Sequence, residues 1–234
     1  MRLMIYKLFY FFVIIVKSNI LLYKLNIFFR NRNVYDRLPS KKFDLFLTGY
    51  QRSGNTFSSR IVNRCFTDSR VSTHFHTIAS IKMALSNKIP IIVIVRSPDD
   101  SVTSSIVRSI GYGEKFDYAL KALYEYRDYY KFLKSHPEVN IIKFTSIIKE
   151  PFKLIGFVGE VIGEQVSEEK FNSDKILESV KNELKSDSRN ASSNTWYSQE
   201  KELKKEEILK EIISTKVYKD CTDLYEAVIK TALF

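Results

Sequence analysis

The sequence predicts an α/β protein in which a central parallel sheet carries helices on both faces. Two short runs, Leu45–Thr48 and Ile91–Val95, are apolar throughout and rich in β-branched residues, as strands buried on both faces are. Helical patterns alternate with such runs along the chain, which is the order of a three-layer fold. At 234 residues, 44% of them hydrophobic, the chain is long enough for one domain with a sizeable core.

The remaining elements follow in the same alternating order. A similar strand is predicted at Asn140–Phe144 and a weaker one at Val71–Phe75, and a polar loop is predicted at Lys185–Asn194. The predicted helices share apolar residues at three- and four-residue steps or a charged helical pattern, and they cover Thr56–Cys65, Ile78–Leu85, Asp99–Ile110, Lys115–Lys134, Phe152–Ile162, Glu168–Leu184, Glu200–Ile213 and Asp220–Thr231. The aromatic stripe of Lys115–Lys134 indicates core packing.

Residues 1–35 are both apolar and basic, and we expect them to form a segment that precedes an α/β domain at residues 40–234. Residues 1–42 hold nine Lys or Arg and one acid, whereas the rest of the chain is nearly neutral. The apolar run Leu8–Val16 is shorter than the roughly 20 residues that span a membrane. Bulky apolar side chains mixed with cations are typical of a helix on an anionic membrane surface. A helix packed on the domain or on another subunit fits the same pattern.

The stretch after the first strong strand has the frame of a phosphate-binding loop. Gly49–Thr56 follows the pattern G-x-x-x-x-G-K-[ST], with Asn55 in place of the lysine. Such a loop surrounds a phosphate with backbone N–H groups at a helix N-terminus, and Arg52 adds a cation. The replaced lysine is the group that reaches the β- and γ-phosphates of a nucleoside triphosphate. The sequence therefore predicts a P-loop-like fold whose phosphate site is not built for ATP or GTP; a plain strand–turn–helix is the alternative.

A second phosphate-type signal follows the second strong strand. Arg96 comes directly after Ile91–Val95, and Ser104 lies eight residues further on, in the helix that starts near Pro98. Arginine can grip a phosphate with two donors, and a hydroxyl can add a third. Because ligands of such sheets bind at the carboxyl ends of the strands, we expect both signals at the same edge.

A histidine pair supplies a candidate general base. His74 and His76 lie at the end of a weaker predicted strand, and a histidine at the ligand edge titrates near neutral pH. A hydrogen-bonded structural histidine is the alternative reading of either one. The two cysteines and three histidines show no metal-ligand spacing, so no metal site is predicted.

These motifs resemble those of the PAPS-dependent sulfotransferases. Tyr50–Phe57, reading YQRSGNTF, is similar to their 5′-phosphosulfate loop. The run Arg96–Asp100 with Ser104 is similar to their 3′-phosphate motif R-x-P-x-D-x-x-x-S, and Thr73-His74 to the segment with their catalytic histidine.

Two further stretches extend the resemblance over most of residues 43–197. Ile141–Gly159 looks like the strand, turn and helix that follow in the family, and Arg189 with Trp196 resembles the loop that closes over the nucleotide. The resemblance implies PAPS as cofactor and PAP as product. It implies binding of the 5′-phosphate by Ser53, Gly54, Asn55 and Thr56, of the 3′-phosphate by Arg96, Ser104 and Arg189, and of the adenine by Phe57 and Phe144. Arg52 would stabilise the bridging oxygen as sulfate leaves, and His74 would remove the acceptor proton, with His76 competing for that role.

The expected function is therefore in-line transfer of a sulfuryl group from PAPS to a hydroxyl or amine, for example of a carbohydrate or small molecule, without a metal. Two alternatives stay open: a P-loop kinase or NTPase with a degenerate loop, and a non-catalytic adaptor that binds a nucleotide at a membrane surface. Nucleic acid is not an expected partner, because the positive charge is concentrated in the N-terminal segment. The expected location is the cytoplasm, peripheral to a membrane, with a Golgi-type membrane anchor as the alternative.

Overall fold

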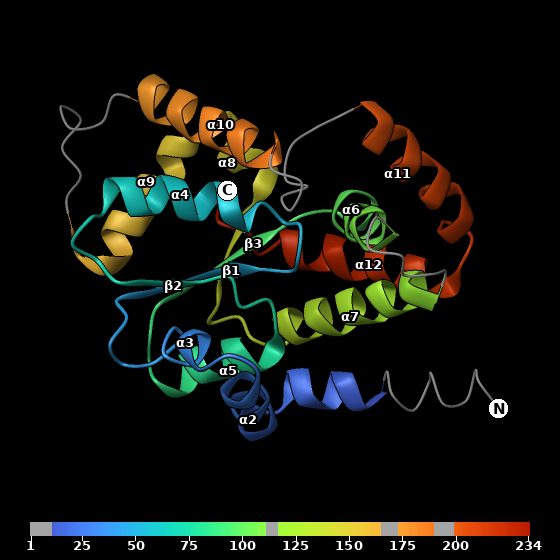
Figure 1. Ribbon diagram of the computed structural model, residues 1–234, viewed down its shortest axis with the longest axis horizontal. Helices are drawn as coiled ribbons and strands as arrows, with labels where there is room; N and C mark the ends of the chain where they lie inside the picture. The colour runs from blue at the N-terminus through green and yellow to red at the C-terminus, as the bar shows by residue number, and fades with distance from the viewer. Residues whose placement is uncertain (1–10, 111–116, 165–172, 190–198) are drawn as a thin grey trace.

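The sheet has four strands, all parallel, in the order β2-β1-β3-β4. The computed structural model describes residues 11–110, 117–164, 173–189 and 199–234. Its strands are β1 (Leu45–Gly49), β2 (Val71–Thr73), β3 (Ile91–Val95) and β4 (Asn140–Lys143). Helices lie on both sides of this sheet (Figure 1), which confirms the predicted three-layer α/β fold.

The helices fill the intervals between the strands and the region after β4. In the described residues they are α2 (Ile20–Arg30), α3 (Arg32–Tyr35), α4 (Asn55–Cys65), α5 (Ile78–Ser86), α6 (Pro98–Ile110), α7 (Asp117–Lys134), α8 (Phe144–Lys149), α9 (Pro151–Ile162), α10 (Ser173–Arg189), α11 (Gln199–Ile212) and α12 (Lys216–Ile229). A further helical stretch, residues 11–18, precedes α2.

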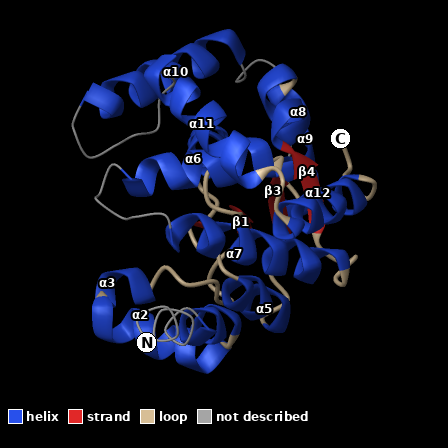
Figure 2. Cartoon of the chain, turned by 90° about the vertical axis from the view of Figure 1, so that its right-hand side faces the viewer, coloured by secondary structure: helices blue, strands red, loops and turns tan. Residues whose placement is uncertain are grey.

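Two apolar cores lie on the two faces of the sheet. The side chains of β3 alternate between them, so that Ile92 and Ile94 enter one core while Ile91, Val93 and Val95 enter the other. The first core is completed by α4, α8, α9 and α10, and the second by α5, α6, α7, α11 and α12. Figures 1 and 2 show α10 and α5 on opposite sides of the sheet. Burial on both faces explains why these strands are continuously apolar in the sequence.

The topology creates a crevice at the carboxyl ends of β1 and β3. From β1 the chain crosses to its neighbour β2 through α4, and it then returns past β1 to β3 through α5. The connection after β1 thus leads toward one edge of the sheet, and the connection after β3 leads to β4 at the other edge. Ligands of open α/β sheets bind in the gap that such a reversal leaves at the ends of the two strands. The candidate phosphate loop follows β1, and Arg96 follows β3.

The structure differs from the sequence-based prediction at several element ends. The segment Lys185–Asn194 was expected to be a loop, but α10 continues to Arg189, and only the part before residue 190 is described. The strand expected over Asn140–Phe144 ends at Lys143, because Phe144 starts the short helix α8. The strand expected over Val71–Phe75 ends at Thr73, so His74 follows the strand. These differences arise where polar or mixed residues carry a weak periodicity, so tertiary packing decides the local structure.

The N-terminal helices pack against the domain through one face and expose the other. Tyr23 of α2 is buried in the second core, and Lys82 of α5 donates to the backbone oxygen of Ser18 at 3.1 Å. Within the described residues, no single helix has both the length and the apolarity to cross a membrane. The pair Phe11–Ser18 and Ile20–Arg30, bent by 99°, meets those criteria only when the two are taken together.

Candidate functional site

The loop after β1 is a tight turn with two residues in the left-handed region and close contacts at both of its glycines. Arg52 and Gly54 have positive φ angles of 66° and 88°, and the N–H of Ser53 donates to the carbonyl of Tyr50 at 3.1 Å. A Cβ on Gly54 would lie 2.1 Å from the ring of Phe144, and one on Gly49 would lie 2.3 Å from a backbone oxygen of β3. The glycines of the motif therefore allow the loop to approach its neighbours closely.

Asn55, in the position of the usual lysine, closes the loop on itself. Its side-chain nitrogen donates to the carbonyls of Tyr50 at 3.0 Å and Gly49 at 3.4 Å, and the side chain is buried. It therefore holds the loop in shape instead of extending toward a ligand. The first backbone N–H groups of α4, which begins at Asn55, have no partner within the helix and remain suited to an anion.

Arg52 and Arg96 lie side by side at the crevice between β1 and β3. The Nε of Arg52 donates to Oγ of Ser104 at 3.0 Å, and Nη1 of Arg96 donates to the backbone oxygen of Arg52 at 3.2 Å. The two strand ends and the helix α6 thus bring together three residues that are up to 52 positions apart in sequence. This grouping is the arrangement that the two phosphate-type signals predict.

Arg96 is held in place from several directions. Its guanidinium stacks over the ring of Phe144 at 4.7 Å from the centroid and lies 3.4 Å from a carboxylate oxygen of Asp100. Two buried tyrosines of α7, Tyr126 and Tyr130, donate to its backbone oxygen at 2.7 and 2.9 Å. Among the described residues, its buried Nε has no hydrogen-bond partner. The aromatic stripe of α7 is core, as predicted, and it also fixes the backbone of this arginine.

A cavity of about 490 Å³ opens over this group, and we call it the donor cavity because arginine and lysine side chains, which are hydrogen-bond donors, line it. Of the predicted cofactor-binding residues, those that line it are Arg52, Gly54, Asn55, Thr56, Phe57, Arg96, Ser104 and Phe144. Ser53 is fully buried and does not line it, and the side chain of Arg189 is outside the described part of the chain, as are Asn190 and Trp196.

The donor cavity is strongly cationic. Among the described residues that line it, Glu202 is the one carboxylate, and the cations are Arg52, Arg96, Arg108, Lys181, Lys201 and Lys205. Burial and the neighbouring Arg52 lower the pKa of Lys201. Burial alone would raise the pKa of Asp100, but Arg96 and Lys205 outweigh it and hold that pKa below its usual range. So high a density of positive charge favours a ligand with several negative charges.

Sequence reasoning missed the three lysines of this cavity, of which Lys181 belongs to α10. Lys201 and Lys205 belong to α11, whose alternating acidic and basic residues look like a solvated surface. Their four-residue spacing puts both on one face of a helix, and α11 packs against α6 beside Arg96. The spacing was readable from the sequence, but the packing partner of that face was not.

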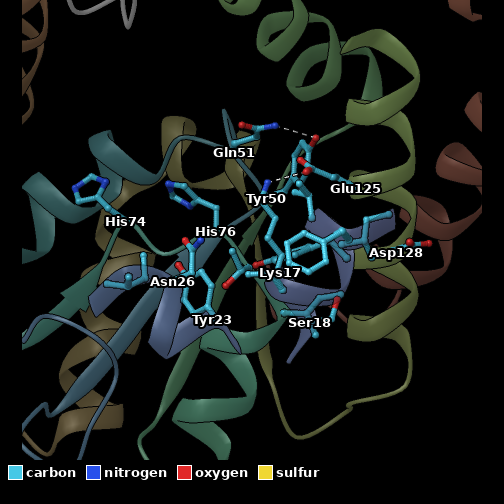
Figure 3. Close-up of a pocket in the computed structure, with 18 of the residues that line it drawn as sticks. Lys17, Ser18, Tyr23, Asn26, Tyr50, Gln51, His74, His76, Glu125 and Asp128 are labelled. Carbon is cyan, nitrogen blue, oxygen red and sulfur yellow. Dashed lines mark hydrogen bonds and ion pairs between the residues drawn. The ribbon is translucent and has the colours of Figure 1, made fainter. Parts of the chain in front are cut away.

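A second cavity, also about 490 Å³, lies beside the donor cavity and separates the roles of the two histidines (Figure 3). His74 lines the second cavity only, whereas His76 and Gln51 line both. Nδ1 of His76 lies 2.9 Å from the carbonyl of Gly49, so Nδ1 carries the proton and the lone pair of the neutral ring is on Nε2. Burial lowers the pKa of His76 to about 4, the Gly49 carbonyl opposing the shift, and burial also lowers the pKa of His74.

The comparisons with other proteins add no functional information. The sequence matches no known protein-family model, and no curated protein is similar enough to count as a relative.

Proposed function

We propose that this protein is a sulfotransferase that uses PAPS to sulfate a hydroxyl or amine. The observation that carries the proposal is that Arg52 and Arg96, each following a different strand, line one cavity together with Ser104 and the start of α4. PAPS has a 5′-phosphosulfate and a separate 3′-phosphate. Two adjacent anion-binding groups in one cavity are what such a nucleotide requires.

The residues of the donor cavity fit that nucleotide in three respects. The N-terminal amides of α4 and the side chain of Arg52 suit the 5′-group, while Arg96 and Ser104 suit the 3′-phosphate. The buried Nε of Arg96, which has no partner among the described residues, is a donor that an anion can satisfy. The ring of Phe144, which lies against Gly54 and Arg96, offers an apolar surface for a base.

The side chain of Asn55 argues against a nucleoside triphosphate as the natural ligand. In the usual phosphate loop a lysine at this position reaches the β- and γ-phosphates. Here the side chain folds back onto the carbonyls of Gly49 and Tyr50. A kinase or NTPase would need Arg52 as a substitute for that lysine.

When bound, PAPS supplies an activated sulfuryl group for transfer to the acceptor. Arg52 and the amides of α4 stabilise the negative charge that develops at the loop. His76 receives the acceptor proton at Nε2, because it borders both cavities and its Nδ1–H is fixed by Gly49. Replacing His76 with alanine then lowers turnover about 10²- to 10⁴-fold. A larger loss in His74→Ala than in His76→Ala would return the role to His74.

Ligand-induced stabilisation tests the proposal directly. The melting temperature of the full chain is measured with PAP, ATP–Mg²⁺ and GTP–Mg²⁺, since a ligand that binds only the native state raises its stability. PAP alone should raise it substantially. A larger shift with ATP–Mg²⁺ would support the kinase or NTPase alternative, and no shift with any nucleotide would support the adaptor alternative.

The assignment of the 3′-phosphate site has its own test. In Arg96→Ala the affinity for PAP, measured by calorimetry, should fall roughly 10- to 100-fold, the value of a hydrogen-bonded charge pair. Arg70→Ala is the matched control, because Arg70 is exposed and lies outside the donor cavity. Unchanged PAP affinity in Arg96→Ala contradicts the assignment.

An anionic membrane surface is the partner that we propose for the N-terminal segment. The exposed apolar side chains of residues 11–30 are Phe11, Phe12, Ile15, Leu21, Leu22, Leu25, Phe28 and Phe29. Residues 1–42 carry nine Lys or Arg and one acid. An apolar face combined with excess positive charge is the chemistry of interfacial helices.

A further inference from the structure

The second cavity lies where the acceptor of a sulfuryl transfer would have to bind. It shares Gln51 and His76 with the donor cavity, so a group bound in it can reach the same histidine. Figure 3 shows His76 between His74 and Tyr50 among the residues that line the cavity. A volume of about 490 Å³ is within the range of small-molecule sites.

The two sides of this cavity come from different parts of the chain. The α/β domain contributes polar residues that include His74, His76, Glu125 and Asp128. The N-terminal helices contribute the apolar residues Phe12, Val13, Ile14, Val16 and Ile27. They also contribute the polar residues Lys17, Ser18, Tyr23, Asn26 and Arg30, of which the first four are labelled in Figure 3.

An ion pair holds the two sides together. Nζ of Lys17, from the N-terminal helical stretch, lies 2.7 Å from a carboxylate oxygen of Glu125 on α7, whose side chain is only 10% exposed. Gln51 is held as well, because its side-chain nitrogen donates to the hydroxyl of Tyr50 at 3.2 Å. The polar groups of the cavity are thus fixed in position, as a site for a defined headgroup requires.

The apolar side of the cavity is continuous with the exposed apolar face of the same helices. Phe12 both lines the cavity and is 59% exposed, and its neighbour Phe11 is 64% exposed. An aliphatic chain can therefore leave the cavity past Phe12, along the apolar side chains of residues 11–16.

We propose that the second cavity is the acceptor site and that its acceptor is an amphiphile, with a hydroxyl-bearing headgroup beside His76 and an aliphatic chain against the N-terminal helices. This inference rests on the proposed sulfotransferase function and specifies its substrate class. The exposed face of the helices places the cavity at a surface from which such a molecule can enter.

Binding of a small amphiphile tests the site without requiring turnover. Octyl β-glucoside, kept below its micelle concentration, is compared with methyl β-glucoside by saturation-transfer NMR on the full chain. The octyl compound should show transfer to both the sugar and the alkyl protons, and the methyl compound should bind at least 10-fold more weakly. Equal binding of the two glucosides overturns the proposal.

A pair of neighbouring substitutions separates the cavity from the exposed face of α2. Asn26→Trp places a large ring in the cavity and should weaken octyl glucoside binding at least 10-fold, whereas Leu25→Trp, outside the lining, should leave it unchanged. Both positions are exposed, so both variants should fold. Equal effects of the two substitutions would mean that the glucoside binds the outer face, and the proposal would fail.

Turnover with PAPS distinguishes this inference from the proposed function. Sulfation of octyl glucoside should exceed that of methyl glucoside at least 10-fold in kcat/KM, and Asn26→Trp should remove the difference. If PAP binds and both glucosides react equally, the protein is a sulfotransferase but the amphiphile site is wrong. If PAP does not bind while Asn26→Trp still weakens octyl glucoside, the proposed function fails and the amphiphile site is retained without it.

Discussion

The contribution of Lys201 to ligand binding can be tested with Lys204, on the same helix, as the control. Lys201 lines the donor cavity near Arg52, whereas Lys204 is exposed and pairs with Glu200 at 2.6 Å. In Lys201→Ala the affinity for PAP should fall roughly 5- to 50-fold, because a charge-assisted contact to phosphate is lost. Calorimetry at low and high salt should show a smaller salt dependence in the variant. Lys204→Ala is the control and should bind PAP as the native chain does.

His76 makes the stability of the fold depend on pH, in a direction that follows from its lowered pKa. Burial lowers its pKa to about 4, and the neighbouring His74, Lys17 and Arg108 act in the same direction, against the carbonyl of Gly49. With an unfolded pKa of about 6.5, the unfolded chain binds more protons between these two values, so stability is complete above pH 6.5 and falls as the pH drops toward 4. Between pH 7 and pH 5 this group should lower the free energy of unfolding by about 2 kcal/mol.

Urea denaturation at the two pH values measures that difference. In His76→Gln the titrating group is gone while a side-chain amide can still donate to the Gly49 carbonyl. The variant should therefore lose about 2 kcal/mol less than the native chain between pH 7 and pH 5. An identical pH dependence of the two proteins would show that His76 titrates normally in the folded state.

At the scale of elements, the loop between β1 and α4 depends on Gly54. Its φ of 88° disfavours any L side chain, and an added Cβ would lie 2.1 Å from the ring of Phe144. Gly54→Ala should lower the free energy of unfolding by about 2–4 kcal/mol, from backbone strain together with displacement of that ring. Chemical denaturation measures the loss, and PAP affinity should fall with it because the loop is displaced.

Gly156 provides the matched control within the same protein. It lies inside α9, and a Cβ there would have no atom within 4 Å apart from its own helix and neighbours. Gly156→Ala should raise the free energy of unfolding by about 0.5–1 kcal/mol, since alanine loses less conformational entropy in a helix. Destabilisation at Gly156 as large as at Gly54 would contradict the argument from the loop.

The elements differ in how far the sequence predicts them. β1 and β3 were predicted almost to the residue, because burial on both faces leaves a continuous apolar run. Gly49, Gly54, Arg52 and Arg96 could be placed at one edge because strand ends in a parallel sheet share that edge.

Three features of the site could not be predicted from the sequence, because they depend on contacts that form only in the folded chain. The contribution of α11 to the donor cavity follows from its contact with α6, and the position of His76 between two cavities follows from its bond to Gly49. The inward turn of Asn55 is likewise a property of the folded loop, because an asparagine at that position has the reach to point either way.

At the scale of the whole molecule, the N-terminal segment combines most of the net positive charge with exposed apolar side chains. The N-terminal helices lie on the side of the sheet opposite α10 (Figures 1 and 2), and they form one side of the second cavity. Phe29 is 80% exposed and Leu21 is 65% exposed, which is unusual for side chains of this size. If these helices lie on a membrane, the second cavity lies between them and the α/β domain, close to that surface.

Vesicle co-sedimentation of the full chain tests this orientation. Vesicles of phosphatidylcholine with 30% phosphatidylserine should bind the protein, and pure phosphatidylcholine should bind it much more weakly, because each cation near an anionic surface contributes about 1 kcal/mol. The double variant Leu21→Glu, Phe29→Glu should reduce binding at least 10-fold, since it loses apolar contact and adds two negative charges. The control is Leu203→Glu, an exposed apolar position on α11. Equal losses in the two variants, or equal binding to both kinds of vesicle, would mean that the N-terminal helices do not form the membrane-binding surface.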